Sequence, residues 1–113
     1  MKNLLVVLAL MVSTISLGQK LNDNATNLKA KNIKEFNKVE LLVQQDYRKS
    51  DPIYTLMINA QIDARRKVAV FMGRDLTSAD YKKLGRYMDM SSEFINGVEI
   101  FNWVLLSNFV SRM

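Results

Sequence analysis

The chain has no histidine and no cysteine among its 113 residues. A serine–histidine–aspartate triad, the usual zinc sites and thiol catalysis require one or both of these residue types, so the sequence excludes them. A glycine-rich phosphate loop and a dinucleotide fingerprint are also absent. Asp89 and Glu93 lie one helical turn apart, but with Lys82 and Arg86 on the preceding turns we interpret them as part of a solvated charged stripe. We therefore expect no enzyme activity, no cofactor or metal ion and no small-molecule substrate.

Proline and glycine are scarce as well, with one proline and four glycines. Long segments without them, in which apolar residues recur three or four positions apart, favour helices. This spacing predicts a first helix over 29–48 and a second over 52–72, with a buried strand at 67–72 as the alternative because short apolar runs are ambiguous. The predicted fold class is all-α, a small helical hairpin or a three- to four-helix bundle.

The start of a third helix is marked by capping residues. The Thr77 side chain can accept from backbone N–H groups of the first turn, and Asp80, three residues later, can reach back as an acidic variant of the capping box. The third helix should therefore begin at Ser78 and turn back on the second helix as an antiparallel hairpin.

The first 18 residues have the layout of a secretory signal peptide, with Lys2, an apolar run and small residues before Gln19. An uncleaved membrane anchor is the alternative, but the apolar run is shorter than the roughly 20 residues of a spanning helix. We expect export to the periplasm or the cell exterior, and a small exported domain without disulfides fits a bacterial envelope. The predicted organisation is a signal peptide (1–18), a flexible polar leader (19–28) and a single α-helical domain (29–113).

The third helical pattern is too long for its partner. From Ser78 to Arg112 it would extend roughly 52 Å, whereas the second helix would cover roughly 31 Å. Three explanations for the apolar overhang stay open. The chain breaks near Ser91-Ser92 or Gly97 and folds back as a fourth helix, it stays long and buries its tip against another copy or another protein, or it enters a membrane.

The apolar side of this tail is the predicted partner-binding surface. Its residues recur three or four positions apart, as on one side of a bundle helix, and exposed apolar patches of this size mark interfaces. Trp103, Leu106 and Val110 fall away from the stripe. Trp103 would be an interface anchor if the tail stays long and would fill the core if the tail folds back. The predicted partner-binding residues are Phe94, Val98, Phe101, Trp103, Leu105 and Phe109.

The net charge is +5 at pH 7, and Lys31, Lys34 and Lys38 share one side of the predicted first helix as a basic surface. Without interleaved aromatic residues this surface does not indicate nucleic acid, and we interpret it as a solvated face. Our hypothesis is a small exported interaction module that self-associates or serves as an accessory subunit of a cell-envelope complex. The alternative is a membrane-surface or membrane-active protein that inserts the C-terminal helix and lays the basic helix on anionic lipid.

Overall fold

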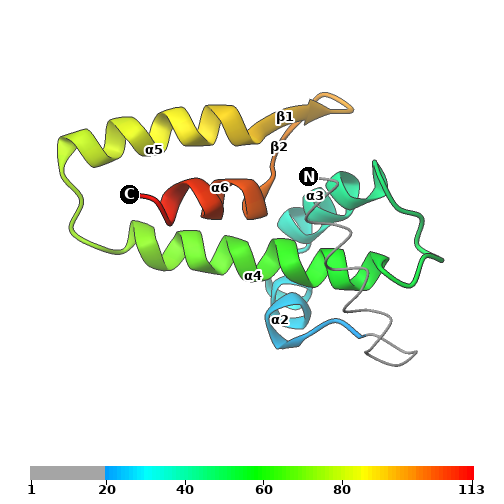
Figure 1. The fold of residues 1–113 in the computed structure, drawn as a ribbon. Coiled ribbons are helices and arrows are strands. Elements are labelled where there is room, and N and C mark those ends of the chain that lie inside the picture. Colours follow the sequence, from blue (N-terminus) through cyan, green and yellow to red (C-terminus); the bar gives the residue numbers. More distant parts are fainter. Residues whose placement is uncertain (1–19) are drawn as a thin grey trace. The chain divides into compact units, whose positions relative to one another are not determined.

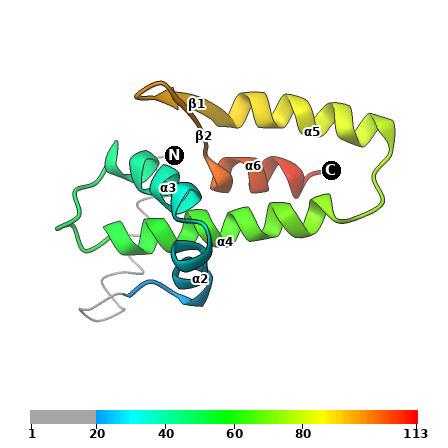
Figure 2. The same ribbon diagram turned by 180° about the vertical axis from the view of Figure 1, so that it is seen from behind.

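A computed structural model describes residues 20–113, which form five helices and two short strands (Figures 1 and 2). These residues are mostly helical, as the sequence predicts, but they include a small antiparallel sheet that the all-α prediction omitted. The predicted signal peptide lies outside the described residues. The elements are α2 (Asp23–Lys31), α3 (Ile33–Gln44), α4 (Tyr54–Met72), α5 (Ser78–Ser91), β1 (Ser92–Ile95), β2 (Val98–Phe101) and α6 (Trp103–Val110).

The chain divides into two compact units, and the division falls within α4. Unit 1 ends at Asn59, and unit 2 comprises Ala60–Met113. Unit 1 therefore contains α2, α3 and the first turns of α4, and unit 2 contains the rest of α4, α5, the hairpin and α6. The expectation of one domain over 29–113 stays a prediction.

The polar segment 19–28 is helical where α2 lies, so the prediction of a flexible leader is wrong there. Asn22 caps α2 by accepting a hydrogen bond from the Ala25 N–H at 2.9 Å, and Ala25 is buried. The buried Asn59 side chain accepts from the Asn22 N–H at 3.0 Å and donates to the Lys20 carbonyl at 2.9 Å. A cap and a distant buried amide thus order a segment that has no apolar periodicity.

The predicted first helix breaks at Asn32, where φ is −148° and ψ is 73°. The Asn32 N–H donates to the Leu28 carbonyl at 2.7 Å and closes α2, while its side chain accepts from the Glu35 N–H at 3.3 Å and caps α3. The helix ends at Gln44, so the predicted end at Arg48 is wrong. The buried face of α3 consists of Phe36, Val39, Leu42 and Val43.

Tyr54 joins the first turn of α4 to α3. Its hydroxyl donates to Glu40 Oε2 at 2.7 Å and accepts from Gln44 Nε2 at 3.3 Å. Burial raises the pKa of Tyr54 to about 12, and the hydrogen bond to Glu40 adds to this shift because it holds the proton on the phenol.

The second predicted helix and the predicted start of the third are confirmed. α4 continues to Met72, so residues 67–72 are helical and not a strand. The Thr77 hydroxyl accepts from the Asp80 N–H at 3.1 Å, and Asp80 Oδ2 accepts from the Thr77 N–H at 3.0 Å, which is the predicted capping box. A short loop then lets α5 run back along α4 (Figure 1).

The tail folds back, as the first of the three explanations proposed. α5 ends at Ser91, the hairpin reverses the chain, and α6 packs against α4 and α5 (Figure 1). The core of unit 2 is formed by Val68 of α4, Leu84 of α5, and Leu106 and Val110 of α6. Leu106 and Val110, which the predicted stripe left outside, are therefore the buried face of the last helix.

Candidate interaction surface

The hairpin turns at Asn96 and Gly97, whose φ angles are 52° and 77°. Two consecutive left-handed residues between paired strands are typical of a type I′ turn, which favours Asn-Gly because only glycine and, less readily, asparagine adopt these angles at low cost. The dipeptide stands between two short segments that contain large apolar residues, SEFI and VEIF. This sequence signal for a hairpin was present, and the helical interpretation of 78–112 overlooked it.

The register of the strands separates the hairpin into two faces. Directly opposed residues of an antiparallel pair project to the same face, and successive residues alternate. Ile95 pairs with Val98 and Glu93 with Ile100, so these four share the inner face, where Ile95 and Ile100 are buried. The outer face is formed by the other two pairs, Phe94 with Glu99 and Ser92 with Phe101.

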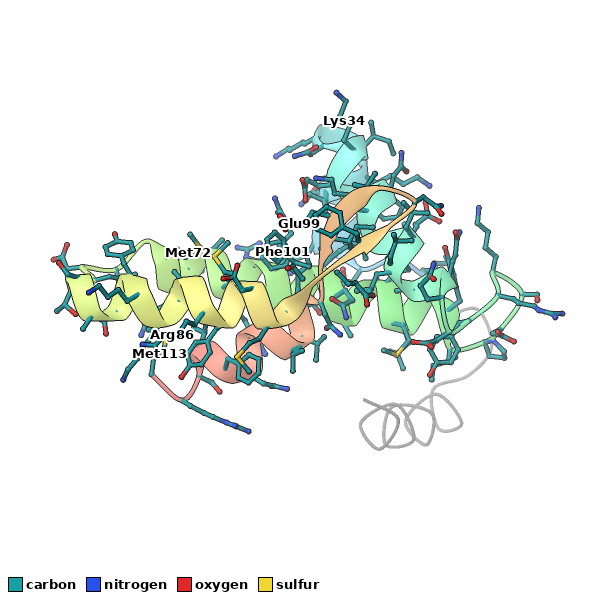
Figure 3. All side chains as sticks on the ribbon, turned by 90° about the horizontal axis from the view of Figure 1, so that it is seen from above. Lys34, Met72, Arg86, Glu99, Phe101 and Met113 are labelled. Atoms are coloured by element: carbon teal, nitrogen blue, oxygen red, sulfur yellow. The ribbon has the colours of Figure 1, made fainter. Side chains whose placement is uncertain are left out.

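The outer face of the hairpin exposes an aromatic side chain beside a carboxylate. Phe94 is 73% exposed, the highest value among the exposed large hydrophobic residues of the described chain. Glu99, directly opposite, is also exposed, and Phe101 is half-buried. Glu99 and Phe101 are labelled on β2 in Figure 3. The outer face, which consists of Ser92, Phe94, Glu99 and Phe101, therefore sets an exposed aromatic side chain beside one carboxylate.

The six predicted partner-binding residues do not form one stripe, because the hairpin interrupts the helix on which the stripe was drawn. Phe94 and Phe101 share the outer face, whereas Val98 projects to the inner face. Phe109 stacks on Tyr87 of α5 with ring centroids 5.0 Å apart. The Phe109 ring is therefore packed within unit 2 and is not available to a partner.

Trp103 and Leu105 lie on α6, beyond the hairpin. The Trp103 ring packs against the core of unit 2, 5.3 Å from the Phe101 ring centroid and 5.8 Å below the Arg65 guanidinium. It therefore joins the outer face to the core, because it contacts both. Leu105 is half-buried and lies about 100° around α6 from the buried Leu106.

A buried polar network, which the sequence did not reveal, holds the end of the hairpin. Gln61 Nε2 donates to Asn102 Oδ1 at 3.0 Å, and Gln61 Oε1 accepts from the Trp103 N–H at 2.7 Å. Asn102 Oδ1 also accepts from the Leu105 N–H at 3.1 Å as the cap of α6. The Asn102 N–H donates to the Ser91 carbonyl at 2.8 Å. Gln61 and Asn102 thus satisfy the first N–H groups of α6 and fix the hairpin to the helix that follows it.

The predicted basic surface is divided. Lys31 ends α2, whereas Lys34 and Lys38 lie on α3 beyond the break at Asn32, so the three lysines do not share one helix. Lys34 lies in the first turn of α3 and points away from the helix (Figure 3). Lys38 Nζ lies 3.2 Å from Glu35 Oε1. The charge of Lys38 is therefore partly neutralised.

Within residues 20–113, no helix is long and apolar enough to cross a membrane. Nor do three or more acidic side chains gather as a possible metal site in this part of the chain. Comparisons of the chain with protein-family models, with curated proteins and with solved structures give no match.

Proposed function

We propose that this chain is an exported, non-enzymatic interaction module, and that the outer face of its hairpin is the contact surface. It would bind another copy of itself or act as an accessory subunit of a cell-envelope complex. The observation that carries the proposal is the exposure of Phe94, because leaving a phenylalanine side chain in water forgoes roughly 1.5–3 kcal/mol of burial energy. A partner that covers Phe94 recovers this energy.

The surroundings of Phe94 suit a binding anchor. The opposite face of the hairpin is fixed by Ile95 and Ile100, which are buried, and the turn uses the residue types that its backbone angles require. An aromatic anchor is typical of an interface hot spot, and the groups around such an anchor exclude water from it when a partner binds. A rigid support also lowers the entropy lost on binding.

The alternative, insertion of the C-terminal helix into a membrane, is less favoured. It would require Leu106 and Val110 to leave the core of unit 2, together with the stacked Phe109.

Export itself rests on the predicted signal peptide over residues 1–18, and cleavage after Gly18 can be checked by sequencing the N-terminus of the exported chain.

The proposal is tested by photo-crosslinking in the cells that express the chain. A photoreactive amino acid replaces Phe94 in one variant and Val70 in the other. Val70 is the matched control because it is also apolar and is 61% exposed, but lies on α4. We expect adducts at position 94 in clear excess over position 70, and the adduct mass separates self-association from another protein. Equal or absent adducts at the two positions contradict the proposal.

A further inference from the structure

The two strands of the hairpin pair only with each other within residues 20–113, so each has a second edge. The Asn102 N–H donates to the Ser91 carbonyl, so Ser91 and Asn102 form a hydrogen-bonded pair of the antiparallel ladder. Hydrogen-bonded and non-hydrogen-bonded pairs alternate along an antiparallel ladder, so Glu93 with Ile100 and Ile95 with Val98 are also hydrogen-bonded pairs. The backbone N–H and C=O groups of Ser92 and Phe94 are therefore directed away from β2, along the second edge of β1.

This second edge of β1 has the chemistry of a strand-docking site. Native proteins protect sheet edges with proline, lysine, bulges, inward-pointing charges or very short strands; β1 has no proline, lysine or bulge, and its protection is limited to its four-residue length and the inward-pointing Glu93. Its four residues are Ser92, Glu93, Phe94 and Ile95, with one charge among them. A two-stranded hairpin is also marginally stable alone, and further strands strengthen it. An extended segment can therefore add to β1 by main-chain hydrogen bonds.

A second copy of the same strand fits this edge in one antiparallel register. A two-fold axis at Phe94 places the two phenylalanines directly opposite, exchanging both backbone hydrogen bonds and covering each other's exposed rings. Glu93 then faces Ile95 of the second copy, so no like charges are opposed. Pairing of β2 about Glu99 would instead oppose two glutamates, which is unfavourable, and pairing about Ile100 would leave Phe94 uncovered.

We propose that a second copy of this chain pairs along β1, with Phe94 on the two-fold axis, to form a four-stranded antiparallel sheet. This inference rests on the proposed function, because it names the partner of the same hairpin. The contact is isologous and closes at a dimer. Two four-residue strands bury less surface than a standard interface, so the dimer is weak and its detection calls for a covalent trap.

The absence of cysteine makes the trap simple, since any disulfide must come from an introduced residue. The variant F94C places two thiols at the axis, where opposed Cα atoms would lie about 5.5 Å apart, within disulfide range. The control is E99C, on the same face and also exposed. In the proposed dimer its two copies would be separated by three strand spacings, about 14 Å, too far for a disulfide.

The chain is expressed in full, purified and oxidised mildly. We expect disulfide-linked dimer from F94C at least about tenfold faster than from E99C, since only the former pair lies within bonding distance. Analytical ultracentrifugation of variants that keep the chain free of cysteine is the second measurement. F94K should weaken dimerisation at least about tenfold by placing like charges at the axis. V70K, at an exposed position of α4 outside the hairpin, should change it much less. Circular dichroism checks that each variant keeps its fold.

Equal or slower cross-linking of F94C relative to E99C, or dimerisation unaffected by F94K, overturns the inference. The two proposals fail in different ways. If photo-crosslinks at position 94 join a different protein while purified F94C stays monomeric, the interaction module stands and the second copy is wrong. If position 94 gives neither adducts in cells nor dimers after purification, both are wrong.

Discussion

Replacing Gln61 with methionine should destabilise unit 2, because this one side chain satisfies two polar groups at the start of α6. Gln61 is buried, donates to Asn102 and accepts from the Trp103 N–H. Methionine has nearly the same volume and leaves no cavity, so the loss reduces to the two hydrogen bonds. At about 1 kcal/mol each, the expected decrease in the free energy of unfolding is about 2 kcal/mol.

Urea unfolding followed by tryptophan fluorescence measures this decrease at the right place, because Trp103 is the single tryptophan of the chain. With a urea dependence of about 1 kcal/mol per molar for a chain this small, the unfolding midpoint should fall by roughly 2 M. The matched control is Lys67→Met, an exposed position on the same helix, which should change stability by less than about 0.5 kcal/mol.

A double-mutant cycle with Asn102→Ala sharpens the test. Gln61 and Asn102 act on the same helix start, so their effects should couple by about 1 kcal/mol instead of adding. A loss below 0.5 kcal/mol for the Gln61 variant (roughly the range of a neutral surface change), or simple additivity in the cycle, would refute the role assigned to this network.

Three further predictions follow from the fold. Leu106→Ala should cost about 3 kcal/mol and Leu105→Ala less than about 1 kcal/mol in urea unfolding, because only Leu106 is fully buried, and equal losses would contradict the packing of α6. Thr77→Ala should cost about 1 kcal/mol by loss of the capping box, seen in calorimetry as a Tm lower by about 4–8 °C, and an unchanged Tm would count against the cap. The raised pKa of Tyr54 means that the folded chain holds this proton more tightly than the unfolded chain, so its stabilisation is complete below pH 10 and is lost as pH rises to about 12. Tyr54→Phe should flatten this fall in stability, and absorbance titration should show one phenol ionising last.

The features that the sequence predicts correctly depend on neighbours in the chain. The capping box of Thr77 and Asp80 needs only residues three positions apart, and the continuous apolar pattern of 52–72 suffices for α4. The helix α2 is different. It is polar, and it depends on a hydrogen bond from Asn22 to Asn59, 37 residues away, which no local pattern reveals.

The hairpin was missed because its apolar residues fit a helical spacing. Phe94, Val98, Phe101 and Leu105 are four, three and four positions apart, as on a helix, while neither SEFI nor VEIF alternates strictly between apolar and polar residues. Apolar spacing therefore favours a helix here. The turn dipeptide decides, because two left-handed residues in succession reverse a strand and do not continue a helix.

Because residues 92–101 form a hairpin and not a helix, different residues must be replaced to test the surface. On a continuous helix, Phe101 and Leu105 would lie on one side, and replacing both with aspartate would remove one contact. In the hairpin, Phe101 contacts Trp103 and supports the core, while Leu105 lies on α6, so the same pair of substitutions would disturb two places. Phe94 projects from the outer face and is largely exposed, so its replacement should change binding while sparing the fold. Phe94, which the helical pattern counted as one of six contacts, is therefore a position where binding and stability can be separated.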